Sequence, residues 1–275
     1  MTNAFNKFFD KIYVISLYDK FERWKKIEKQ FGNRKIKVER FIAVDGRCKN
    51  EGEKACMDKL KSFEIAFDVT ILDKKSKKQP VQELLPAASL TIGTILILRD
   101  MVRKNLKHIL ICEDDVVLTH GIETKFKQGL KEIGNYKWDV LYLGCGGRCG
   151  YKGVSYEKTS TNKFLSGVPA AEHSDDEYYV AVAEDLRMPC EQIDCIPFSD
   201  HISFAKRPAG TWAYAYSLEG AKKMLKLIDD NASNHIDHLL REPISEGKIK
   251  ALSFDPPIVW HEGGIARTDS DIPWE

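Results

Sequence analysis

The chain has 275 residues, of which 43% are hydrophobic and 30% are charged, so it can bury a substantial core as one large domain or two small ones. Lys and Arg number 42 against 41 Asp and Glu, a balance that gives no broad electrostatic drive toward nucleic acid or an anionic membrane. The most apolar stretch, 87–98, is too short to span a bilayer.

In the first half of the chain, the expected elements are strands at 11–17, 38–44 and 108–112, and helices at 20–31 and from Pro86 onward. The first strand, the helix with apolar residues at helical spacing and the second strand predict a β-α-β unit with a parallel strand pair. The helix from Pro86 would carry the proline in its first turn. The polar, Lys-rich residues 47–85 are expected in surface loops.

In the second half, the expected elements are a helix at 122–133, strands at 138–143, 210–216 and 248–254, and a helix capped by Ser217. Residues 145–208 are expected to form long loops or an insertion. The alternation of strands and helices predicts an α/β fold, with a mixed, mostly parallel sheet and helices on both faces.

The cysteines and the chain ends bear on the cellular compartment. No signal pattern opens the sequence, and SDIPWE at its end is not an ER-retention motif. The seven cysteines are therefore interpreted as reduced thiols, and the expected location is cytoplasmic. Zinc pairs at Cys145-x3-Cys149 and Cys190-x4-Cys195 are a weak alternative, because their spacing is wider than that of zinc knuckles.

Three acidic residues, Glu113, Asp114 and Asp115, interrupt the apolar segment HILICEDDVVL. Ligands of such sheets bind beyond the carboxyl ends of the strands. In an extended chain Glu113 and Asp115 point the same way, and two converging carboxylates repel each other unless a cation lies between them. The pattern favours Mg²⁺ or Mn²⁺ with oxygen ligands. The alternative is a strand-to-loop turn whose acids cap a helix or pair with surface lysines.

Several segments together resemble glycosyltransferase family 25, which includes bacterial lipooligosaccharide galactosyltransferases and procollagen hydroxylysine glycosyltransferases. The matching segments are YVISLYDKFERW (13–24), FIAVDG (41–46), LILRDMV (96–102) before ILICEDDVVL (109–118), DVLYLG (139–144), GTWAYAYSLEGAKKML (210–225), HIDHLL (235–240) and PPIVWH (256–261). They cover most of the chain except roughly 47–85 and 150–205.

The resemblance implies a single catalytic domain over 1–275 with a GT-A-type, Rossmann-like fold, variable insertions near 47–85 and 150–205, and hexose transfer from a UDP-sugar. Mn²⁺, or alternatively Mg²⁺, would be held by Glu113 and Asp115, with His261 beyond the last strand as a third ligand. The implied donor contacts are Ser16, Leu17, Arg23, Asp45, Gly144 and Trp212, and the implied catalytic residues are Asp237 and Asp114.

Four of these residues have a structural alternative. Ser16 suits a strand-end hydrogen bond, Asp45 an Asp-Gly turn, Asp237 the N-terminus of a helix, and Trp212 a packed core position. The chain departs from the family pattern at Ser16, where Asn is usual, and at Gly93-Thr94, which replaces a Ser-His pair.

The expected donor is UDP-glucose or UDP-galactose. The first expected acceptor is hydroxylysine or galactosylhydroxylysine of a collagen-like peptide, and a lipopolysaccharide-type glycan is the alternative. A sugar-nucleotide-binding module without turnover and a divalent-metal nucleotidyltransferase are the other candidates. Arg148 is a further candidate phosphate contact and the acidic run 175–177 a candidate acceptor contact, while the helix over 87–98 is either core or a homodimer interface.

Overall fold

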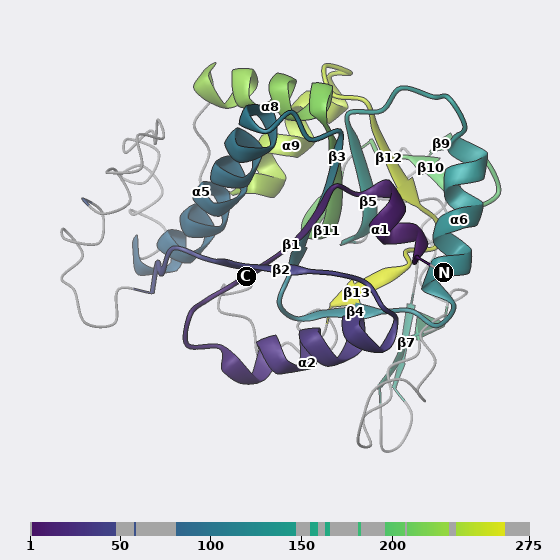
Figure 1. Ribbon diagram of the computed structural model, residues 1–275. Coiled ribbons are helices and arrows are strands. Elements are labelled where there is room, and N and C mark those ends of the chain that lie inside the picture. The colour runs from purple at the N-terminus through teal and green to yellow at the C-terminus, as the bar shows by residue number, and fades with distance from the viewer. Residues whose placement is uncertain are drawn as a thin grey trace.

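The computed structural model describes residues 2–47, 58, 81–146, 155–158, 163–165, 181–182, 196–206, 208–230 and 235–261. Its largest sheet within these residues has eight strands in the order β2-β1-β3-β11-β5-β12-β10-β9 (Figure 1). The strands are β1 (Lys11–Ser16), β2 (Glu39–Ile42), β3 (His108–Glu113), β5 (Val140–Gly146), β9 (Ile196–Pro197), β10 (Ile202–Phe204), β11 (Ala209–Ser217) and β12 (Ala251–Phe254).

The sheet is mixed. β1 runs parallel to both β2 and β3, and β12 runs parallel to β5. β11 is antiparallel to both neighbours, β3 and β5, and β10 is antiparallel to β12 and β9. The expected α/β fold with a mixed sheet is therefore confirmed, as is the parallel pair formed by the first two strands. The expectation of a mostly parallel sheet is wrong, because β11 and β10 each run antiparallel to both of their neighbours.

Helices cover both faces of this sheet, as Figure 1 shows. The helices are α1 (Ala4–Phe8), α2 (Phe21–Asn33), α5 (Val81–Arg103), α6 (Ile122–Ile133), α8 (Leu218–Asp230) and α9 (Ile236–Ser245). One apolar cluster joins α5, α8 and α9 to Ile109 and Ile111 of β3. The other joins α1, α2 and α6 to Leu110 and Cys112, because successive side chains of a strand point to opposite faces.

For the helix over 87–98, the sequence allows either a core position or a subunit interface. In α5, Ile92, Ile95 and Leu98 are fully buried within the chain, where they pack against α8 and α9. This supports the core interpretation. Among the described residues, no helix is both long and apolar enough to cross a membrane.

A second, two-stranded sheet pairs β4 (Val116–Leu118) with β13 (Val259–His261), which run antiparallel. The expectation that His261 lies beyond the last strand is therefore wrong, since it ends β13 opposite Val116. A third sheet holds β6 (Ser155–Lys158), β7 (Lys163–Leu165) and β8 (Ala181–Val182) in the order β7-β6-β8.

Local signals located the elements with mixed success. The helix expected at 122–133 matches α6, and Ser217 caps α8 by accepting a hydrogen bond from the Gly220 N–H at 3.0 Å. The helix expected to start at Pro86 instead starts at Val81, so the proline lies inside α5. Cys145 is disulfide-bonded, which differs from the reduced thiols expected from the sequence.

Gly144 allows β13 to approach the main sheet closely. A Cβ atom added to Gly144 would lie 2.0 Å from the backbone oxygen of Val259. No side chain fits in that space, because a contact under 3.0 Å requires the neighbour to move. The glycine therefore sets how closely β13, and with it β4, packs on β5.

We expect Gly144→Ala to lower the free energy of unfolding by about 2 kcal/mol, since overpacking forces backbone shifts. Gly32→Ala is the matched control, because nothing lies within 4 Å of its added Cβ and alanine favours a helix. Urea unfolding of both variants measures the difference. Equal stability of Gly144→Ala and the wild type would show that β13 can move aside without cost.

Glu132 of α6 anchors the turn between β9 and β10. Its carboxylate accepts hydrogen bonds from Ser199 Oγ at 2.5 Å, from the His201 N–H at 2.9 Å and from Gln128 Nε2 at 2.8 Å. His201 Nδ1 lies 2.6 Å from the same carboxylate. Desolvation alone would raise the pKa of Glu132, but these hydrogen bonds outweigh it and lower the pKa to about 2.

We expect Glu132→Gln to lose about 2 kcal/mol of stability at neutral pH, the range of hydrogen bonds to a charged group. Because the folded-state pKa is lowered, the contribution of Glu132 is complete above its ordinary pKa of about 4.3. It is lost as the pH falls toward 2. Urea unfolding at several pH values should show the two proteins converging with acid. Exposed Glu28→Gln should change little at any pH, and a pH-independent difference at position 132 would contradict the charge argument.

Candidate active site

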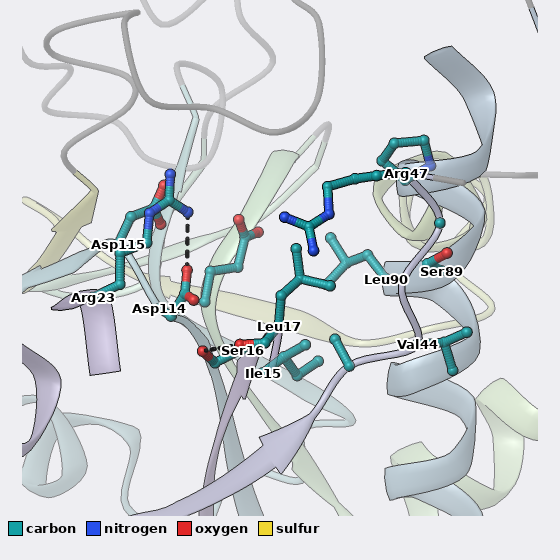
Figure 2. A pocket seen from close by; sticks show the side chains of 14 residues that line it. Ile15, Ser16, Leu17, Arg23, Val44, Arg47, Ser89, Leu90, Asp114 and Asp115 are labelled. Carbon is teal, nitrogen blue, oxygen red and sulfur yellow. Dashed lines mark hydrogen bonds and ion pairs between the residues drawn. The ribbon is translucent and has the colours of Figure 1, made fainter. Parts of the chain in front are cut away.

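A pocket opens at the carboxyl ends of β1, β2 and β3, beside the N-terminal half of α5 (Figure 2). It encloses about 660 Å³, including its open mouth. Its lining residues are Ile15, Ser16, Leu17, Arg23, Ala43, Val44, Gly46, Arg47, Pro86, Ser89, Leu90, Glu113, Asp114 and Asp115. The pocket thus brings together Ser16, Leu17, Arg23 and all three residues of the acidic motif.

The acidic motif is a turn and not an extended segment. β3 ends at Glu113, Asp114 and Asp115 form the turn, and β4 begins at Val116. Arg23 Nη1 donates to Asp114 Oδ1 at 3.0 Å, and both side chains are largely buried, at 12% and 9% exposure. A dashed line marks this ion pair in Figure 2. Asp114, a predicted catalytic residue, is therefore engaged with Arg23, a predicted donor contact.

Negative charge is concentrated at this turn. Desolvation raises the pKa of Glu113 well above its usual range, and the charges of Asp115 and Asp114 raise it further. A hydrogen bond from Thr211 Oγ1 to Glu113 Oε1, at 3.4 Å, opposes the shift. Desolvation also raises the pKa of Asp114, although Ser16 and Arg23 counteract it. These shifts mean that the three carboxylates lie close enough to repel one another.

The carboxylates of the acidic turn are a suitable type of ligand for a hard divalent cation. Such ions prefer carboxylate oxygens, and Mg²⁺ commonly uses one or two carboxylates together with substrate phosphates. Glu113 and Asp115 offer such oxygens. Desolvation first, and then the charges of Asp115 and Asp114, raise the pKa of Glu113, and a cation would offset both effects. Within the described residues, no group of three or more His, Cys, Asp and Glu side chains is arranged to hold a metal ion. The His261 side chain lies outside the described atoms.

Arg40 of β2 fixes the loop after β1 by hydrogen bonds. Arg40 Nη2 donates to the backbone oxygen of Leu17 at 2.7 Å, to Ser16 Oγ at 3.1 Å and to the Tyr18 oxygen at 3.3 Å. The guanidinium also lies over the rings of Phe21 and Trp24, at 5.8 and 5.4 Å from their centroids. Ser16 therefore has the strand-end hydrogen bond that was its structural alternative, and it lines the pocket as well.

Arg47 is a pocket residue that the sequence analysis missed. Its Nε and Nη2 donate to the two carboxylate oxygens of Asp45 at 2.8 and 2.6 Å, and Nη2 also donates to Asp19 at 2.9 Å. The side chain is only 11% exposed, and it reaches into the pocket from the side opposite Asp114 and Asp115 (Figure 2). Asp45, a predicted donor contact, is not part of the lining and instead fixes Arg47. The basic residue directly after Asp45-Gly46 was the available signal.

Trp212 and Gly144 do not line this pocket. Trp212 is 8% exposed and packs against Trp260, with ring centroids 6.2 Å apart. Regular alternation would have put Trp212 on the same face as Tyr214, but register shifts in β11 before and after Ala213 interrupt it. Trp212 consequently joins the apolar cluster on the opposite face of the sheet from Tyr214.

Thr94, at the departure from the family pattern, lies in the core. Its Oγ1 is 2.8 Å from the hydroxyl of Tyr214, and both residues are buried. Gly93 packs beneath the pocket, where an added Cβ would lie 3.5 Å from the Phe41 ring. In the described structure Gly93 and Thr94 therefore have packing roles.

Asp237 lies in the first turn of α9. Its charge adds to the effects that raise the pKa of Glu113, after desolvation and the two neighbouring aspartates. It also contributes, after desolvation and Tyr214, to the raised pKa of Tyr142. Asp237 is therefore within electrostatic reach of the acidic turn. Arg148, the acidic run 175–177 and three of the four cysteines weighed for zinc lie outside the described residues.

Comparison with known proteins gives one informative match. Residues 9–240 match the family model described as Glycosyltransferase family 25 (LPS biosynthesis protein), whereas no curated protein matches. A crystal structure described as mannose-1-phosphate geranyltransferase from Thermus thermophilus is similar over 88% of this chain, with 7% identity and a TM-score of 0.31. The chain spans 58% of that protein's length, and a likeness this low supports no conclusion. The family match covers most of the chain and agrees with the resemblance in its motifs: the chain belongs to glycosyltransferase family 25.

Proposed function

We propose that this chain transfers a hexose, glucose or galactose, from a UDP-sugar to a hydroxyl acceptor, with Mn²⁺ or Mg²⁺ as the cofactor. Family membership implies glycosyltransferase activity and a sugar-nucleotide donor. The observation that carries the finer proposal is the convergence of three carboxylates on one pocket at the carboxyl ends of parallel strands. Nucleotides bind at that edge of open α/β sheets.

Glu113 and Asp115 are the proposed ligands of the cation, because both are carboxylates that line the pocket. When bound, a divalent cation supplies Lewis acidity that stabilises the UDP leaving group. The ion pair of Asp114 keeps that carboxylate turned toward α2, between the two proposed ligands. Arg23 thus contributes to donor binding by holding the turn.

The rest of the pocket suits the nucleoside end of the donor. Ile15, Leu17 and Val44 supply apolar walls, and Arg47 supplies a guanidinium whose orientation Asp45 and Asp19 fix. Ligand pockets commonly combine mostly apolar walls with a few fixed polar groups. In this proposal Arg47 donates to an oxygen of the nucleotide.

Asp237 is the proposed general base. It lies in the first turn of α9, and its charge acts on Glu113 of the acidic turn. A carboxylate there could accept the proton of the acceptor hydroxyl during transfer. The acceptor would then approach over α9 while the nucleotide occupies the pocket beside α5.

Two acceptor classes follow from the family. Hydroxylysine or galactosylhydroxylysine of a collagen-like peptide is the first. A lipopolysaccharide-type glycan is the second, and the description of the matching family as an LPS biosynthesis protein favours it. Both present a hydroxyl group, so the same acidic turn serves either one.

We expect release of UDP from UDP-glucose or UDP-galactose when Mn²⁺ is present, and a loss of about 10²–10³-fold in kcat for Asp115→Ala. Coupled detection of free UDP measures both. The control is Asp200→Ala, an exposed aspartate before β10, which should turn over like the wild type. UDP release that is equally fast in Asp115→Ala would remove the metal assignment. No turnover with any UDP-sugar would favour a binding module.

We expect an acceptor panel to separate the two classes. The panel offers hydroxylysine peptides, galactosylhydroxylysine peptides and bacterial glycans to the full chain with the active donor. Mass spectrometry should detect a gain of one hexose on one class. Since transfer is read on the acceptor, slow hydrolysis of the donor by water does not mimic it. Labelling of glycans alone would remove the collagen-like acceptor from the proposal.

A further inference from the structure

The strand that follows the acidic turn, β4, is held on both of its edges by different partners. On one edge it pairs with β13, through Val117 opposite Trp260. On the other edge it meets α2, where the side chain of Gln30 makes two contacts. Gln30 Nε2 donates to the Val116 oxygen at 2.6 Å, and Gln30 Oε1 accepts from the Leu118 N–H at 3.1 Å.

The Gln30 amide acts as a substitute for a neighbouring strand. In a strand, the C=O of residue i and the N–H of residue i+2 point to the same edge. A backbone neighbour would satisfy this pair with one N–H and one C=O, and the carboxamide of glutamine offers the same donor and acceptor. β4 is buried, with Val116 and Leu118 at 2% and 1% exposure, so leaving these groups without partners would be costly.

Gln30 works together with Arg23. The two residues are seven positions apart in α2, which is two helical turns, so they lie on the same face. Arg23 binds Asp114, at the start of the segment, and Gln30 binds Val116 and Leu118 further along. One face of α2 therefore fixes the chain immediately before and immediately after Asp115.

We propose that Gln30 is a positioning residue for the cation and donor site. Its two hydrogen bonds fix the Val116 peptide and so set the direction in which Asp115 faces. The same residue, Val116, pairs with His261 at the end of β13, so Gln30 also fixes the strand against which that backbone lies. The inference rests on the proposed function, because it gives Gln30 a role toward the cation that Glu113 and Asp115 would bind.

Binding of Mn²⁺ to the full chain tests this role without requiring turnover. Electron paramagnetic resonance reports free Mn²⁺, and each variant is measured well below its unfolding midpoint. Gln30→Met keeps the side-chain length and removes both hydrogen bonds. We expect its Kd for Mn²⁺ to rise at least about tenfold, the usual effect of losing a group that orients a ligand.

Gln30→Glu is the second variant, and it decides the test if Gln30→Met fails to fold. It keeps the acceptor for the Leu118 N–H and loses the donor to Val116. Its added negative charge would by itself favour a cation, so weaker Mn²⁺ binding in this variant isolates the lost geometry. The control is Gln128→Met, which removes one amide hydrogen bond to Glu132 on α6 and should leave the Kd unchanged.

The outcomes are distinct. Weaker Mn²⁺ binding in the folded Gln30 variants, with the Gln128→Met control unchanged, supports the proposal. Unchanged or tighter binding in the folded Gln30 variants overturns it, even if their stability falls, and leaves the proposed function intact. If the wild type binds no Mn²⁺, the metal part of the proposed function fails, and the positioning role fails with it.

Discussion

The repulsion among three carboxylates at the end of one buried strand is the constraint around which this site is organised. Desolvation penalises the charged forms of Glu113 and Asp114, and the charge of Asp115 acts on both. Arg23 pairs with Asp114, and Thr211 donates a hydrogen bond to Glu113. All three carboxylates line the pocket, and the proposed divalent cation would stabilise their charged forms there.

The site draws on segments that are distant in sequence. The proposed nucleotide end is formed by β1, β3, α5 and the segment after β2, whereas the proposed base comes from α9 near the end of the described chain. β11 lies antiparallel between β3 and β5, and Thr211 near its start reaches back to Glu113. The reversal of this one strand allows the second half of the chain to contribute a hydroxyl directly beside the acidic turn.

The sequence correctly predicted the elements and the cap that are determined by neighbouring residues. The helix at 122–133, the Ser217 cap and the apolar strand before Glu113 each carry their signal within a few residues. The assumption of an extended acidic motif failed because the chain turns at Asp114, where Arg23 of α2 binds it. Trp212 lies on the opposite face from Tyr214 because a bulge changes the face of a strand residue, and Gly210, with a φ of +74°, lies within that irregular stretch. Gln30 was not recognised because its partners are 86 and 88 positions away.

The contacts of Arg40 with the loop after β1 have a consequence for ligand affinity. A flexible loop must lose conformational freedom before it can bind, and this loss subtracts from the binding free energy. Here the backbone oxygens of Leu17 and Tyr18 are already restrained by a guanidinium that lies over two aromatic rings. The nucleoside wall is thus rigid before any ligand arrives. We expect a ligand to bind at this wall with little conformational change in the loop.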